Sequence, residues 1–259
     1  MTTNQELKDE IVQIDGINIH VMRKGAGEPL LYLHGSNGNP SWNPFLESLS
    51  QEFDVIAPEH PGFGKSETAP WIREVDDLVY FYRSFLDHFG IEKVYLIGQS
   101  FGGWIAAEFA SSQTHRVNKM VLVAAAGVHK EGAPRADIFA MSPEDAANKL
   151  VHSPELKQKF RALSLTPEAQ SMSIRNTQAF ARFAWRISYN VKLPNRLRWA
   201  KVPALVLWGR DDQIISSEYA DYYASLLPQA RTKIIEDCGH LPYVEKPEET
   251  RQAIVEFFK

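Results

Sequence analysis

The chain has 259 residues, 44% of them hydrophobic and 23% charged, which is the composition of a folded globular protein. This length is sufficient for one large α/β domain or for two smaller domains with buried cores. Because 28 Lys and Arg residues stand against 32 Asp and Glu residues, the formal net charge is −4, so we expect no nucleic-acid partner.

The N-terminal stretch "MTTNQELKDE" lacks the basic and apolar segments of a signal peptide. No run approaches the ~20 apolar residues that a membrane-spanning helix needs. Cys238 is the single cysteine, so an internal disulfide is excluded. We therefore expect a cytoplasmic protein without a membrane partner. The sequence does not distinguish a monomer from a homodimer.

The first predicted elements are a hairpin and a buried strand. In "IVQIDGINIHVM" (residues 11–22) apolar residues alternate with others on either side of Asp15-Gly16, a pair typical of a hairpin turn. "PLLYLHG" (29–35) is continuously apolar, as in a central strand. Further apolar runs lie at 53–57, 94–98, 120–126, 204–209 and 232–235, and helical periodicity lies at 75–89, 104–111, 218–227 and 248–258. This alternation predicts a mostly parallel sheet with helices on both faces.

The stretch "PGFGKSE" (61–67) contains the Gly-Lys-Ser of a phosphate-binding loop. That motif requires a glycine five positions before Gly64, where this chain has Glu59, an anion at the place that phosphate would occupy. Pro70 also interrupts the expected helix start. We therefore reject a nucleotide-hydrolysing function.

The stretch "LIGQSFGGW" (96–104) brackets one serine with glycines where an apolar run ends. A sharp strand-to-helix turn would force Ser100 into a strained backbone conformation that costs on the order of 1–3 kcal/mol. Glycine at 98 and 102 would remove the side chains that collide in such a turn. An ordinary glycine-rich turn is the alternative.

Residues 129–198, called the helical segment below, show no convincing strand. Three helix starts, "SPED", "SPEL" and "TPEA", each combine a Ser or Thr cap, a proline and an acid. They predict an inserted helical cap at 129–198 and a core formed by 1–128 and 199–259.

The helical segment is basic, with 12 Lys and Arg against 6 Asp and Glu, a net of +6; since the whole chain is −4, the remainder carries −10. Either a basic cap docks on an acidic body, or the segment attracts an anionic substrate. The arginines of "RNTQAFARFAWRISYN", Arg175, Arg182 and Arg186, lie with Tyr189 on one helical face. This face is either solvated or binds a substrate carboxylate in the cleft.

The sequence G-Q-S-F-G at 98–102 resembles the G-x-S-x-G nucleophile elbow of the α/β-hydrolase superfamily. "APEHPGFGKSE" resembles its D-x-P-G-x-G-x-S segment, with Glu59 at the position of the usual Asp. The resemblance covers nearly the whole chain. It implies the α/β-hydrolase fold, a mostly parallel eight-stranded sheet flanked by helices, with an inserted helical cap.

The resemblance also implies a catalytic triad in the chain order serine, acid, histidine. Ser100 needs a base that is itself oriented by a carboxylate. Asp212 follows the predicted strand of "LVLWGRDD", where Asp211 competes with it; the family's G-x-x-D spacing from Gly209 selects Asp212. His240 in "CGHLPYVEKPEE" resembles the family's histidine loop, although a surface histidine is the alternative.

The family's oxyanion hole would use the backbone amides of Phe101 and Ser36, each contributing ~3–4 kcal/mol. The predicted substrate pocket comprises Trp42, Trp104, Trp185, Arg182, Arg186 and Leu241. We expect a small-molecule substrate, no cofactor and no metal.

A serine at the elbow argues against the dehalogenase and epoxide-hydrolase branches, which use aspartate there. Two hydrolytic reactions remain: cleavage of a carboxylic ester through an acyl-enzyme, and cleavage of a carbon–carbon bond in a ring-fission dienoate. Several members of the second branch have Trp after the histidine and Asn or His before the serine, where this chain has Leu241 and Gln99. We therefore favour the ester. A non-catalytic ligand receptor is the third alternative.

Overall fold

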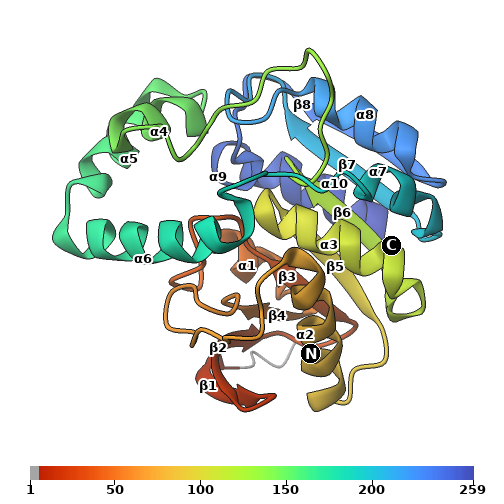
Figure 1. Cartoon of the computed structure of the whole chain (residues 1–259). Coiled ribbons are helices and arrows are strands. Elements are labelled where there is room, and N and C mark those ends of the chain that lie inside the picture. Colours follow the sequence, from red (N-terminus) through yellow and green to blue (C-terminus); the bar gives the residue numbers. More distant parts are fainter. Residues whose placement is uncertain (1–5) are drawn as a thin grey trace.

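The computed structural model describes residues 6–259 except the side chain of residue 143; residues 1–5, part of the predicted core and of the N-terminal stretch discussed above, lie outside the described part. Within residues 6–259, eight strands form one sheet in the order β1-β2-β4-β3-β5-β6-β7-β8 (Figure 1). The strands are β1 (Lys8–Ile14), β2 (Ile17–Lys24), β3 (Pro29–Leu33), β4 (Asp54–Pro58), β5 (Val94–Gln99), β6 (Val117–Val123), β7 (Ala204–Gly209) and β8 (Ala230–Ile235). β2 is antiparallel to both of its neighbours, and all other pairs are parallel. The predicted eight-stranded, mostly parallel sheet is confirmed.

The predicted hairpin joins β1 to β2. Asp15 (φ 47°) and Gly16 (φ 82°) both have positive φ, as a two-residue turn of the I′ type requires. Ile14 pairs with Ile17 directly beside this turn, which sets the register of the whole hairpin.

The helices are α1 (Pro44–Leu49), α2 (Val75–His88), α3 (Phe101–Ser112), α4 (Pro143–Leu150), α5 (Pro154–Ser164), α6 (Pro167–Ala184), α7 (Leu193–Arg196), α8 (Glu218–Leu226), α9 (Pro242–Glu245) and α10 (Pro247–Phe258). Short 3-10 helices span Thr114–Arg116 and Leu197–Trp199. In residues 6–259 no helix combines the length and the apolar character needed to cross a bilayer.

The helices cover both faces of the sheet, as expected from the apolar runs. Alternate residues of β3 show this, since Leu31 and Leu33 pack into the core beneath α2, α3 and α8. Leu30 and Tyr32 pack into a second core beneath α1 and α10. The side chains of β3 therefore pack alternately on the two faces of the sheet.

β6 begins and ends three residues earlier than predicted. It spans Val117–Val123, whereas the apolar run suggested 120–126. The chain leaves the sheet at Ala124, whose φ is 46°, and the amide of Ala126 then donates to the carbonyl of Ser100 at 2.9 Å. The apolar character of these alanines reflects burial beside the elbow rather than strand pairing.

The helical segment contains α4, α5 and α6, which Figure 1 shows grouped on one side of the body that holds the sheet. Each predicted cap forms: the hydroxyl oxygens of Ser142, Ser153 and Thr166 accept from the amides three residues later at 3.1, 3.4 and 3.2 Å. Between 129 and 198 the structure contains no strand among the described residues, only isolated bridges that pair Gly127 with Tyr189 and Arg135 with Ile215.

Candidate active site

Ser100 lies between β5 and α3 with φ 52° and ψ −112°, a conformation that L-residues rarely adopt. Two backbone bonds hold it there: its amide donates to Val123 and its carbonyl accepts from Ala126, both at 2.9 Å. A Cβ at Gly98 would lie 2.4 Å from the carbonyl oxygen of Gly102, and a Cβ at Gly102 would lie 2.0 Å from that of Leu33. The two glycines therefore permit the close packing of strand and helix that holds the serine at the turn.

Asp212 and His240 meet at the carboxyl ends of β7 and β8. The Nδ1 atom of His240 lies 2.7 Å from Oδ2 of Asp212, and the imidazole is buried. Oδ1 of Asp212 accepts from the amides of Ile214 and Ile215 at 2.8 and 2.9 Å. Both carboxylate oxygens are thus occupied, which fixes the carboxylate and leaves Nε2 of the ring free of it.

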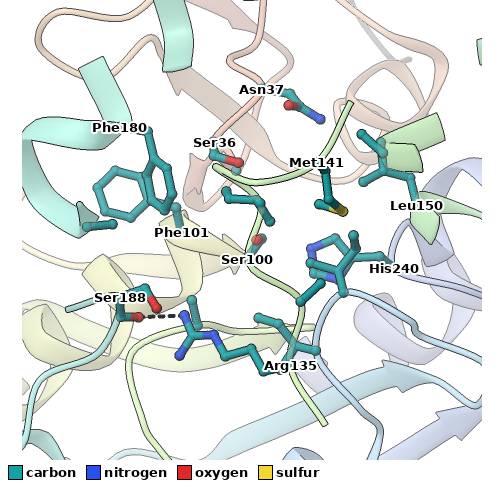
Figure 2. A pocket seen from close by; sticks show the side chains of 18 of the residues that line it. Ser36, Asn37, Ser100, Phe101, Arg135, Met141, Leu150, Phe180, Ser188 and His240 are labelled. Atoms are coloured by element: carbon teal, nitrogen blue, oxygen red, sulfur yellow. Dashed lines mark hydrogen bonds between the residues drawn. The ribbon is translucent and has the colours of Figure 1, made fainter. Parts of the chain in front are cut away.

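Ser100 and His240 line the same cavity, whose volume is about 760 Å³. Figure 2 shows the hydroxyl and the imidazole beside each other on its wall. Among the described residues no hydrogen bond joins the two side chains. Bonds between nucleophile and base are often long before substrate binds, so the arrangement remains compatible with proton transfer.

The loop after β3 brings Ser36 to the same wall, next to Ser100 and Phe101 (Figure 2). The amide of Gly38 donates to the carbonyl of Gly35 at 3.1 Å, and a Cβ at Gly35 would lie 2.1 Å from Oε1 of Gln99. This close packing holds the loop against the end of β5. Phe101 is the first residue of α3, so its N–H has no acceptor within the helix.

Comparison with known proteins shows the family to which this fold belongs. The family model described as "Alpha/beta hydrolase family" matches residues 30–253. The chain belongs to the alpha/beta hydrolase family. The resemblance read from the elbow and the histidine loop is thereby confirmed.

Relatives of this alpha/beta hydrolase carry several activities. A 2-hydroxy-6-oxononadienedioate/2-hydroxy-6-oxononatrienedioate hydrolase of Paraburkholderia phymatum is 30% identical, over 93% of this chain and 91% of that protein. A 2-hydroxy-6-oxo-6-phenylhexa-2,4-dienoate hydrolase of Comamonas testosteroni is 26% identical over the same shares, 93% and 91%. The structure of a bacterial membrane phospholipase A superposes with a TM-score of 0.83 at 27% identity, over 97% of this chain and 86% of that chain.

Three of the six residues predicted for the pocket of this hydrolase line the cavity: Trp185, Arg186 and Leu241. The other three do not, and their predictions are corrected. Nε1 of Trp42 donates to Glu47 at 2.7 Å, and Trp104 is buried with its Nε1 3.4 Å from Glu108. Arg182 donates to the carbonyls of Ala69 and Ile72 at 3.0 and 2.7 Å. Each polar group had a partner in the body that its sequence position did not reveal.

Several basic side chains of the helical segment contact the body. Arg175 donates to the carbonyl of Ser66 at 3.0 Å, as Arg182 does to its own carbonyl partners. Acidic partners are also present: Lys130 pairs with Glu218 at 2.8 Å, and Arg196 pairs with Asp76 and Glu108 at 3.0 Å. The face with Arg175 and Arg182 therefore packs on the body through backbone oxygens.

Two histidines support the Ser36 loop from behind. His34 accepts at Nε2 from the amide of His60 at 2.9 Å, so its Nδ1 carries the proton that it donates to Gly35 at 2.7 Å. Burial lowers the pKa of His34 to about 4, and the pKa of His60 also lies well below its ordinary value, mainly through burial. Both rings are neutral at pH 7.

One group of potential metal ligands lies outside the cavity. Single donor atoms of His152, Asp211 and Asp237 come within 4.8 Å of one another. Nδ1 of His152 lies 3.2 Å from Asp211, an ion-pair geometry that needs no metal. Asp211 thus pairs with the helical segment, whereas Asp212 holds His240.

Arg135 and Tyr219 are among the polar residues of the cavity wall that the sequence did not predict. Arg135 lies in the irregular stretch between β6 and α4, where no periodicity indicates which way a side chain points. Tyr219 lies in α8, where its apolar ring fits the helical pattern of a core residue. In neither case does the sequence pattern indicate that the residue lies on the cavity wall.

Proposed function

We propose that the protein is a serine hydrolase that cleaves a carboxylic ester of a small substrate through an acyl-enzyme. The observation that carries the proposal is the buried His240–Asp212 pair, with its 2.7 Å contact, on the same cavity wall as the strained Ser100. A strained serine beside an oriented imidazole is the arrangement that nucleophilic catalysis requires.

In this mechanism the Oγ atom of Ser100 attacks the ester carbonyl, and Nε2 of His240 takes the hydroxyl proton. Asp212 keeps the proton of the imidazole on Nδ1 and stabilises the imidazolium. The amides of Phe101 and Ser36 donate to the oxyanion. His240 then gives its proton to the leaving alcohol, and a water activated by the same ring hydrolyses the acyl-enzyme.

The same proposal assigns residues 129–198 as a cap over a core formed by 1–128 and 199–259. Support comes from the cavity wall, because Phe139, Met141 and Phe180 of the helical segment line it together with Ser100 and His240. Together they give the cavity a large apolar surface, so a small apolar or aromatic substrate suits it.

Carbon–carbon bond hydrolysis is the second candidate. It is favoured by the relative of Paraburkholderia phymatum, which is named as a hydrolase of 2-hydroxy-6-oxononadienedioate and is 30% identical over 93% of this chain. Gln99 and Leu241, at the positions that differ from several members of that branch, support the ester instead.

Turnover of 4-nitrophenyl esters and of a chromophoric ring-fission dienoate tests both candidates. We expect the wild-type protein to release nitrophenol and Ser100→Ala to lose this activity. Ser112→Ala, at the far end of the same helix, is the matched control and should retain it. Fading of the dienoate without ester cleavage would select the carbon–carbon reaction, and no turnover of either would leave a ligand receptor.

A further inference from the structure

The guanidinium of Arg135 lies on the cavity wall without an acidic partner. It donates to the backbone oxygens of Ser188 and, at 3.5 Å, of Val128. Among residues 6–259 no carboxylate lies within 4.0 Å of it. Arginine has five N–H donors, so these two contacts leave donors for a further oxygen. A partly buried cation that lacks a counter-ion attracts an anion strongly.

Tyr219 supplies a second donor on the same wall. The residue is only 1% exposed, and its hydroxyl has no hydrogen-bond partner within the described part of the chain. A buried hydroxyl left without a partner is destabilising, and an oxygen of a bound ligand would satisfy it. The backbone of Arg135 pairs with Ile215, four residues before Tyr219, and both side chains line the cavity. Burial lowers the pKa of Arg135.

The other charged side chains of the cavity wall leave it net positive. Arg186 adds a second cation, and Asp137 is the one carboxylate among the described lining residues. Asp137 accepts from the amide of Phe139 at 3.0 Å and forms no ion pair with Arg135 in residues 6–259. Figure 2 shows Arg135 in the lower part of the view, joined to Ser188 by a dashed line, with Phe101 and Phe180 above it.

We propose that Arg135 and Tyr219 form an anion subsite, and that the preferred substrate carries a carboxylate at the end remote from its reacting carbonyl. This inference rests on the proposed hydrolase function of the same cavity. The guanidinium would bind the two carboxylate oxygens side by side, and the Tyr219 hydroxyl would donate to one of them. The apolar wall near Phe180 and Met141 would contact the chain between the two ends of the substrate.

A purely structural role for Arg135 makes a different prediction. Its bonds join Val128, directly before the helical segment, to Ser188 near the end of that segment, next to the bridge of Gly127 with Tyr189. If this were its whole function, its loss would slow all substrates alike. The subsite instead predicts a change in the preference between charged and neutral substrates.

The test compares 4-nitrophenyl hydrogen suberate with 4-nitrophenyl octanoate, which share chain length and leaving group but differ in the distal carboxylate. We expect the wild-type ratio of kcat/KM, suberate over octanoate, to exceed one. It should fall about 10- to 100-fold in Arg135→Met and about 10-fold in Tyr219→Phe, with an intermediate loss in Arg135→Lys, because hydrogen bonds to charged groups are the strong ones. Tyr223→Phe is the control, since that hydroxyl is bound to the carbonyl of Ala126, and it should keep the ratio.

Calorimetric titration of Ser100→Ala with suberate tests the subsite without turnover. If neither ester is cleaved, the proposed function fails, and weaker suberate binding after Arg135→Met still supports the subsite. An equal loss on both esters, or unchanged suberate affinity in Arg135→Met, would overturn the subsite. An unchanged ratio in Tyr219→Phe would remove the hydroxyl from it.

Discussion

Two regions meet at the cavity: the carboxyl ends of β3, β5, β7 and β8, and the helical segment. At the strand ends Asp212 is held by the amides of Ile214 and Ile215, and Asp212 in turn holds the ring of His240. In the helical segment α5 buries none of its described side chains. α6 contacts the body through Asn176, through two arginines and through the buried Ala179, Phe180 and Ala184. The strand ends thus hold the proposed catalytic side chains in a fixed geometry, whereas the less tightly packed helical segment contributes the wall of the cavity.

The largest expected effect concerns the strand ends. Asp212→Asn should lower kcat on a nitrophenyl ester by ~10⁴-fold, because an amide in place of the carboxylate favours the wrong tautomer of His240. Asp211→Asn, one residue away and paired with His152, is the control and should change kcat little. Equal losses in the two variants would contradict the assignment of Asp212.

Acid should destabilise the strand-end region before the helical segment. The pKa of His34 is about 4 in the folded chain and about 6.5 when unfolded, so the unfolded chain binds more protons between these values. The resulting stability is present above pH 6.5 and is lost as the pH falls to 4, by about 3 kcal/mol for His34. Urea unfolding at several pH values measures it, and His34→Gln should flatten the dependence. An unchanged slope in that variant would refute the explanation.

The attachment of α6 is the next test. The buried side chain of Asn176 accepts from the amide of Gly64 at 2.9 Å and donates to the carbonyl of Asn37 at 2.6 Å. Asn176→Ala leaves both groups without a partner, so we expect a loss of about 2 kcal/mol in the free energy of unfolding. Asn148→Ala, which removes an exposed contact with Arg161, should cost far less in the same urea titration. Equal costs would mean that Asn176 does not secure the helix.

The smallest effect is local to the helical segment. Thr166→Ala removes the cap of α6, worth about 1 kcal/mol, and should speed hydrogen exchange in the first turn of that helix. Exchange at Ser100 and His240 should stay as in the wild type. Faster exchange at the strand ends would show that the two regions are less independent than their contacts indicate.

The sheet and the serine turn could be predicted from sequence because their signals are local, and the proposed Asp212 and His240 because their motifs resemble those of the family. Gly98 and Gly102 are needed by the turn itself, and Asp15-Gly16 sets the hairpin within two residues. The cavity wall could not be predicted, because its residues come from segments that only tertiary packing brings together. Trp104 illustrates this. Its aromatic side chain suggested a pocket residue, but its neighbours in the fold bury it against Glu108.

The histidine loop shares its anchors with the helical segment. The amide of His240 donates to the last carbonyl of α4, Leu150, at 2.9 Å. Glu245 accepts from Gly239 at 2.6 Å through one oxygen and from the amides of His152 and Ser153 at 2.6 and 3.1 Å through the other. Moving α4 away to admit a bulky molecule would therefore break the backbone bond of His240 and the contacts of Glu245 together, so opening of the cavity and positioning of His240 are linked.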